Sequence, residues 1–165
     1  MLFHVAVAPD ATRSGPEAMT IAELVDHIRS DFHLVELALM RDLAGSMQRL
    51  RHPPRPSLTA VCDAFQVLAE ELTAHMEKEE KVLFPWIRAG RGDLAHAPIR
   101  VMLLEHRETL ERLDALRDRT RALGSQGDTL PAEVASALDS LDRHVREHMH
   151  LENDFLFPRA LRGEG

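Results

Sequence analysis

Two stretches of this chain decide how it folds: residues 75–85 read HMEKEEKVLFP, and residues 148–158 read HMHLENDFLFP, 73 positions later. Each begins with His-Met, has a glutamate four residues after the histidine, and ends in Leu-Phe-Pro. Residues four apart lie one turn apart on the same face of a helix. Each stretch therefore predicts a helix that presents a histidine and a carboxylate side by side, next to an apolar end.

The same spacing of 73 residues recurs elsewhere in the chain. His33 and His106 share it, and each precedes the second histidine of its half by 42 residues. Leucine pairs keep the offset as well: Leu37 with Leu110, Leu43 with Leu116 and Leu68 with Leu141. The two halves of the chain therefore resemble each other, which predicts an internal repeat with pseudo-two-fold symmetry.

Turn and capping residues divide the chain into four long helical segments. A capping box, Thr20 with Glu23, opens the first segment, which we expect to run to about Arg51. The proline-rich residues 52–56 and the glycine-containing residues 90–93 are the next breaks. We expect the second helix to run from an N-cap at Ser57 to about residues 85–88, the third from a first-turn proline at Pro98 to about Gly124, and the fourth from about residues 129–131 to about Leu161.

Apolar residues within these segments recur at helical spacing and not in the alternation typical of strands. Short loops between long helices place consecutive helices antiparallel. We therefore predict an all-α fold, an up-down-up-down four-helix bundle over residues 20–162 that follows an N-terminal extension of residues 1–19. Within the extension only Leu2 to Ala8 could be extended, as an edge strand, a swapped arm or a tail.

The composition restricts the classes of protein to which this chain can belong. A chain of 165 residues suits one domain, and 28% charged residues with a formal charge of −7 argue against a nucleic-acid surface. No apolar run approaches the ~20 residues that span a membrane, and no basic-then-apolar leader opens the chain. The lone Cys62 excludes an internal disulfide and favours a reducing compartment, the cytoplasm. Ten histidines are the unusual feature.

Helix lengths bring the repeated residues to one level of the bundle. About 20 residues separate His33 from the turn near residue 53, and about 20 more lead back to His75, at ~1.5 Å of rise each. The same count holds for His106, the turn near residue 126 and His148. The sequence thus predicts one layer of six inward-facing residues: His33, His75, Glu79, His106, His148 and Glu152.

Such a layer predicts a metal centre. Buried carboxylates are costly unless they are paired or bind metal, and neutral imidazoles with carboxylates suit a transition metal. Two carboxylates able to bridge suit two metal ions, and His/Glu sites in helical bundles commonly hold two iron ions. No thiolate belongs to the layer, which argues against structural zinc and against an iron–sulfur cluster.

Both repeats, together with LEH at residues 104–106 and DFH at residues 31–33, resemble the hemerythrin-like (HHE cation-binding) fold. More narrowly, they are similar to the carboxy-terminal domain of the di-iron proteins that repair iron–sulfur clusters, the RIC or ScdA-type family. The resemblance covers about residues 21–161. It implies two iron ions in an oxo- or hydroxo-bridged centre, with Glu79 and Glu152 as bridges and histidines as terminal ligands. It also implies a role under nitrosative or oxidative stress in a bacterial cytoplasm.

Two features depart from that family. Its repair proteins carry a separate amino-terminal domain with a vicinal cysteine pair, whereas about twenty unrelated residues precede the bundle here and Cys62 is alone. His52 matches a family histidine near the end of the first helix, yet 19 residues of straight helix would put it ~28 Å from His33. We therefore expect His52 to lie outside the metal site unless the helix breaks, for example at Gly45.

The residues around the layer have simpler expected roles. Glu71 and Glu105 are candidates to accept hydrogen bonds from the histidines or to carry protons, with surface salt bridges as the alternative. Within residues 77–81 only Glu79 is expected to point inward. We expect core packing from Met76, Leu83, Phe84, Met149, Leu156 and Phe157, and solvent exposure of His27, His96, His144 and His150.

Three functions remain open at this point. A stress-response protein would donate iron or reduce NO or O2, which leaves open whether the chain is an enzyme with turnover. A reversible O2 carrier or sensor would need a stable oxygenated state, and an iron store or structural bundle would need only a labile site. The first is favoured by the resemblance. Expected partners are NO, O2 or peroxide and a reductase or iron–sulfur protein, with neither nucleic acid nor a membrane.

Overall fold

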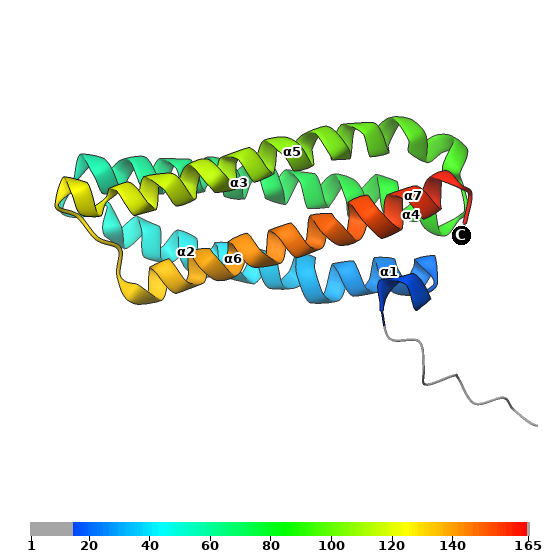
Figure 1. The fold of residues 1–165 in the computed structure, drawn as a ribbon, viewed down its shortest axis with the longest axis horizontal. Coiled ribbons are helices and arrows are strands. Elements are labelled where there is room, and N and C mark those ends of the chain that lie inside the picture. Colours follow the sequence, from blue (N-terminus) through cyan, green and yellow to red (C-terminus); the bar gives the residue numbers. More distant parts are fainter. Residues whose placement is uncertain (1–14, 165) are drawn as a thin grey trace, which may run out of the picture.

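The computed structural model describes residues 15–164, and every regular element within that range is helical. The possible strand at residues 2–8 lies outside the described residues. Four long helical segments lie side by side (Figure 1) and are joined by short turns. The all-α prediction is therefore confirmed over the described part of the chain.

Each long segment consists of consecutive helical elements. A short 3-10 turn, η1 (Pro16–Ala18), precedes the first of them. The first segment is α1 (Ile21–His27), η2 (Ile28–His33) and α2 (Leu34–Leu50), and the second is α3 (Pro56–Lys78), η3 (Glu79–Leu83) and α4 (Phe84–Arg88). The third is α5 (Gly92–Ala122), followed by η4 (Gly124–Gln126), and the fourth is α6 (Ala132–Leu151), η5 (Glu152–Leu156) and α7 (Phe157–Leu161).

The first helix begins as its sequence predicts. The backbone N–H of Glu23 donates to Thr20 Oγ1 at 3.2 Å, and the Thr20 N–H donates to Glu23 Oε2 at 2.8 Å. These reciprocal bonds form a capping box, which satisfies two donors that a helix start otherwise leaves free. The segment then continues to Leu50 without interruption at Gly45.

Two expected helix starts were wrong. Ser57 is not an N-cap, because α3 begins at Pro56 and the Ser57 hydroxyl instead hydrogen-bonds Asp128, in the turn between α5 and α6. The third helix begins at Gly92 and includes Pro98 in its interior. Its apolar face starts before the proline, since Ala95 is fully buried, and this packing outweighs the one backbone hydrogen bond that Pro98 cannot donate.

The start of α5 also explains a glycine. A Cβ atom at Gly92 would lie 2.6 Å from the carbonyl oxygen of Ala160, the penultimate residue of α7. Only a residue without a side chain allows so close an approach of two backbones. The first turn of α5 is therefore packed directly on the end of the fourth segment.

Three of the four segments contain a π-helical stretch, which the sequence did not predict. These stretches are η2, η3 and η5, and they lie inside otherwise α-helical segments. His33 ends η2, Glu79 begins η3 and Glu152 begins η5. Extra residues of this kind inside α-helices are frequent at functional sites, because they re-aim side chains locally.

The core is divided into two apolar clusters. One packs the C-terminal parts of α2 and α5 against α3 and α6, and it includes Met76 and Met149. The other lies towards α1, α4 and α7 and includes Leu83, Phe84, Leu156 and Phe157. All six of these expected core residues are buried, so that prediction is confirmed.

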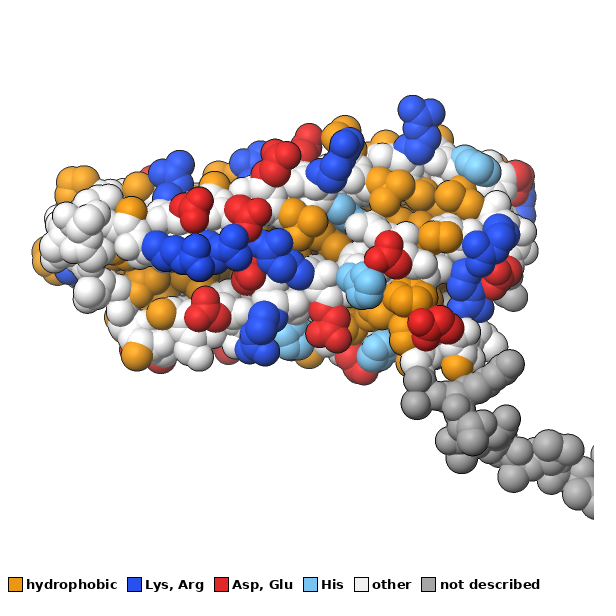
Figure 2. All heavy atoms as spheres, viewed as in Figure 1, with side chains coloured by type: hydrophobic (Ala, Val, Ile, Leu, Met, Phe, Trp, Pro, Cys, Tyr) orange, Lys and Arg blue, Asp and Glu red, His pale blue; other side chains and the backbone are white. Residues whose placement is uncertain are grey.

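The surface is strongly charged, and its charges are mixed. Figure 2 shows acidic and basic side chains interspersed over the face that α5 and α6 present. Arg146 on α6, for example, pairs with Asp114 on α5 at 2.8 Å. Among the helices of residues 15–164, none combines the length and the apolar character needed to cross a bilayer.

Candidate metal centre

The structure brings the six predicted residues together. Each of the four segments contributes to the set, and every one of the six side chains is at most 2% exposed. They form two groups in which the potential ligand atoms lie within 4.8 Å of one another. One group is His33, Glu79, His148 and Glu152, and the other is His75, Glu79, His106 and Glu152.

In the first group two histidines face two carboxylates. The Nε2 atoms of His33 and His148 are 3.0 Å apart. His33 Nε2 lies 3.5 Å from Glu79 Oε2, and His148 Nε2 lies 3.3 Å from Glu152 Oε2. The four side chains therefore direct nitrogen and oxygen atoms at one small volume.

The second group repeats this arrangement with the same two carboxylates. The Nε2 atoms of His75 and His106 are also 3.0 Å apart. His75 Nε2 lies 3.3 Å from Glu79 Oε1, and His106 Nε2 lies 3.2 Å from Glu152 Oε2. The two oxygens of Glu79 thus face different histidine pairs, as a bridging carboxylate requires.

The carboxylates fit a metal better than they fit the protein alone. Neither oxygen of Glu79 and neither oxygen of Glu152 has a hydrogen-bond partner among the described residues, although both side chains are fully buried. Buried carboxylates are strongly unfavourable unless a cation compensates them, and without metal only the protonated imidazoles at 3.2–3.5 Å can do so. Imidazole nitrogen with carboxylate oxygen is a donor set that suits iron, zinc and similar transition metals.

Each histidine of the layer also makes a hydrogen bond through Nδ1, the ring nitrogen that faces away from the layer. The Nδ1–H of an imidazole that donates to an oxygen leaves the lone pair of Nε2 free to bind metal. All four histidines have such an acceptor: His33 has Glu80 at 2.8 Å, His75 has Glu105 at 2.9 Å, His106 has Asn153 at 2.7 Å and His148 has Glu36 at 3.2 Å. All four Nε2 atoms accordingly face the inside of the layer.

Two phenylalanine rings pack against histidines of the layer. Phe84 stacks on His33 with ring centroids 5.6 Å apart, and Phe157 stacks on His106 at 5.7 Å. These phenylalanines do more than fill the core, since each fixes the plane of one imidazole. The apolar clusters on both sides of the layer keep water away from it.

Three of the four acceptors were missed from the sequence. Glu105 was a candidate and does contact His75, whereas Glu71 pairs with Arg112, which is the salt-bridge alternative. Glu80 and Asn153 directly follow the shared glutamates and are themselves 73 residues apart, so the repeat contained a signal for them. Glu36 has no such signal.

Burial and neighbouring charges compete to set the pKa values of the layer. Burial alone would lower the pKa of His75, but Glu79, Glu152 and Glu105 outweigh it and raise that pKa to about 9. The same competition, with Glu152 and Glu36 as the neighbours, raises the pKa of His148 well above its usual value. Burial would raise the pKa of Glu152, but His148 and His106 hold it well below its usual range. Metal binding must therefore displace protons from the histidines.

The other histidines of residues 15–164 lie outside the layer. His52 is exposed in the turn after α2, consistent with its expected exclusion from the site. His96 and His150 are exposed as expected. His27 and His144 are only half-buried, which corrects the expectation of full exposure, because both rings pack against Phe32.

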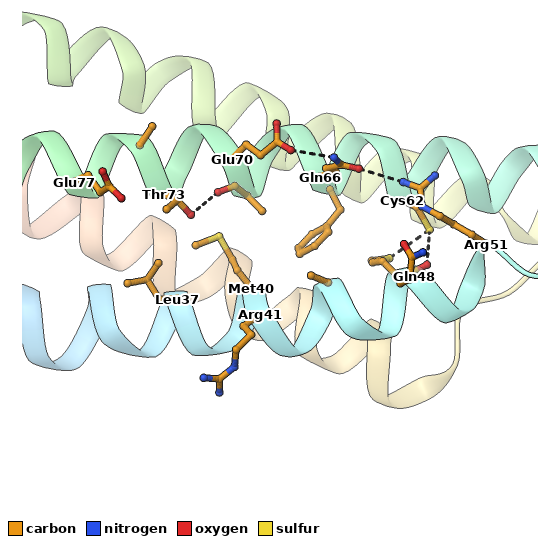
Figure 3. Close-up of a pocket in the computed structure, with 15 residues that line it drawn as sticks. Leu37, Met40, Arg41, Gln48, Arg51, Cys62, Gln66, Glu70, Thr73 and Glu77 are labelled. Atoms are coloured by element: carbon orange, nitrogen blue, oxygen red, sulfur yellow. Dashed lines mark hydrogen bonds between the residues drawn. The ribbon is translucent and has the colours of Figure 1, made fainter.

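Two of the hollows between these helices differ in their position relative to the layer. A groove of about 750 Å³ runs between α2 and α3 (Figure 3), and none of the six layer residues lines it. Met40, Cys62 and Phe65 are among its lining residues. A smaller hollow of about 260 Å³ lies beside His75 and is bordered by Lys78 and Glu105. Among the hollows of the described residues, the smaller one is lined by a layer residue, His75, whereas two others border Glu80 on the side of His33.

A bundle of long helices with clustered histidines and glutamates defines a class of metal-binding protein, and comparison with known families agrees. The model of the hemerythrin HHE cation binding domain matches residues 25–160, and this chain belongs to that family. The iron-sulfur cluster repair protein YtfE of Dickeya chrysanthemi (strain Ech1591) is 32% identical over 168 residues, covering 99% of this chain and 76% of the relative. The protein of the same name from Escherichia coli O81 (strain ED1a) is 37% identical over 161 residues, covering 92% and 70%.

Proposed function

We propose that this chain is a non-haem di-iron protein of the nitrosative and oxidative stress response, acting in iron–sulfur cluster repair or in chemistry on NO and O2. The observation that carries the proposal is the pair of His/Glu groups that share Glu79 and Glu152. The relatives named for iron–sulfur cluster repair support the choice of process.

The proposed ligands are the six residues of the layer. His33 and His148 would hold one iron ion, His75 and His106 the other, and Glu79 and Glu152 would bridge them. The bound pair would supply redox chemistry and open coordination positions for NO, O2 or peroxide. The protein would supply fixed imidazole orientations, through the acceptor behind each Nδ1, and a layer from which water is excluded.

The proposal includes an up-down-up-down bundle with a pseudo-two-fold repeat over residues 20–162, and an extension of residues 1–19 outside it. The alternating direction of the coloured segments in Figure 1 supports this topology. The repeat is supported by equivalent stacking pairs, since Phe84 on His33 and Phe157 on His106 both differ by 73 positions.

Turnover would depend on another molecule. Cys62 is the only thiol in the sequence and is buried, and burial raises its pKa, so it is poorly suited to relay electrons or iron. We propose that a reductase or an iron–sulfur protein completes the reaction in a reducing, cytoplasmic setting. The chain by itself would then react with NO and O2 once and stop.

Stopped-flow spectroscopy on the anaerobic di-ferrous protein tests the proposal. We expect rapid consumption of NO with conversion to a di-ferric spectrum, and no further turnover until a reductant is added. His52→Ala serves as the control variant and should react like the unaltered protein.

The other outcomes would select another function. A long-lived O2 adduct that releases O2 reversibly, with little NO chemistry, would identify an oxygen carrier or sensor. If neither gas perturbs the iron spectrum and chelators remove the metal within seconds, an iron store or structural bundle is the correct reading.

A further inference from the structure

The acceptor behind His148 differs from the other three. Glu36 lies on α2, three residues after His33, and is fully buried. Its Oε2 accepts the hydrogen bond from His148 Nδ1 at 3.2 Å, and its Oε1 has no hydrogen-bond partner among residues 15–164. Within the same range, His148 is also its only ion-pair partner.

The remaining acceptors are either neutralised or uncharged. Glu80, behind His33, lies near the surface and pairs with Arg29 at 3.4 Å. Glu105, behind His75, has a side chain 25% exposed and pairs with Lys78. Asn153, behind His106, is an amide and carries no charge. Glu36 is thus the one acceptor among the four with a buried carboxylate and no Lys or Arg partner in the described structure.

This difference divides the two histidine pairs. A carboxylate that accepts from Nδ1–H makes the imidazole a stronger donor to metal, and its charge acts at full strength where water is excluded. The His33/His148 pair has that carboxylate. The His75/His106 pair has one amide and one carboxylate already paired with a lysine. The position 73 residues after Glu36 is Thr109, which is buried but uncharged, so the second half of the chain offers no equivalent.

We propose that the two metal positions are inequivalent: the His33/His148 position fills first and empties last, and Glu36 is the positioning residue responsible. The inference rests on the proposed function, because it assumes that both positions bind metal. The ion at the His75/His106 position is then the one that exchanges, and it lies next to the hollow bordered by Lys78 and Glu105. One ion stays in the protein while the other can be delivered.

Anaerobic titration of the apoprotein with Co²⁺ against a competing chelator tests this, read by the visible spectrum of the bound ion. The unaltered protein should bind two ions in two resolved steps. Glu36→Gln should weaken the tighter step by about tenfold, the lower end of the usual effect of changing the partner behind a ligating histidine, because the Gln amide can still accept from Nδ1 but carries no charge. Glu105→Gln should act mainly on the weaker step.

Weaker metal binding by a variant could also result from misfolding, so a variant that is expected to bind metal more tightly is tested beside it. Asn153→Asp places a carboxylate behind His106 with almost no change of shape, and should tighten the weaker step by about tenfold. Crystals of the unaltered protein grown with one equivalent of Co²⁺ should show anomalous density between His33 and His148. Circular dichroism of each apo variant checks that the helices persist.

The outcomes separate the two proposals. Binding of fewer than two ions by the unaltered protein would overturn the di-metal function itself. Two ions of equal affinity, or a Glu36→Gln variant that weakens only the looser step, would overturn the inequivalence and leave the di-metal function standing. Density between His75 and His106 in the half-loaded crystals would have the same consequence.

Discussion

Glu79→Ala is expected to remove both metal ions, whereas His75→Ala should remove one. The reason is that Glu79 faces both histidine pairs, through Oε2 to His33 and through Oε1 to His75. Loss of a shared ligand weakens two positions at once, and each tenfold loss of affinity corresponds to about 1.4 kcal/mol. Iron per chain, measured after anaerobic reconstitution and desalting, should fall from two to near zero for Glu79→Ala and to about one for His75→Ala.

Glu152→Ala should behave like Glu79→Ala, because Glu152 Oε2 faces both His106 and His148. His52→Ala is the matched control, since it removes an exposed imidazole from the turn after α2 and should leave the iron content unchanged. Loss of iron from His52→Ala as severe as from Glu79→Ala would mean that the geometry of the first helix, and with it the ligand set, is wrong.

Removal of the metal should destabilise the protein, and the effect should grow with pH. A ligand present at 100 times its Kd stabilises a fold by about 2.7 kcal/mol, so two ions contribute about 5 kcal/mol. For a domain of this size that corresponds to a Tm about 10–20 °C lower for the apoprotein. The pH dependence follows from the protonated histidines, which take the place of the metal as partners of the carboxylates.

The direction of this pH dependence follows from His75, whose pKa is about 9 in the folded apoprotein and ordinarily 6.5. Its stabilising contribution is therefore fully present below pH 6.5 and is lost as the pH rises through about 9. The metal-loaded protein does not depend on those protons. The Tm difference between the two forms, measured by circular dichroism, should widen from pH 6.5 to 9.5, and less so in a His75→Asn variant. An apoprotein that gains stability over this range would contradict the account.

Much of the site was predictable because its residues obey the spacing of the repeat. His33, His75, Glu79, His106, His148 and Glu152 were placed in one layer by counting residues from each turn, and the structure brings them together. The count works because an α-helix rises by a constant amount per residue, so equal lengths on both sides of a turn return to the same level.

The rest depends on contacts that spacing does not encode. Glu36 reaches His148 from a different segment, and its partner is 112 residues away in the chain. The π-helical stretches are five or six residues long and lie inside longer α-helical patterns, so the helical spacing of apolar residues did not reveal them. The chemistry of Pro98 favours a helix start, whereas packing of Ala95 and the close approach at Gly92 begin the helix six residues earlier.

In the proposed function one chain holds two iron ions between two histidine pairs that share Glu79 and Glu152. Elemental analysis of protein purified anaerobically with iron supplied measures this stoichiometry. We expect two irons per chain, with no preference for zinc when both metals are offered equally. A reproducible ratio of one metal per chain, or zinc taken up in preference to iron, would contradict it.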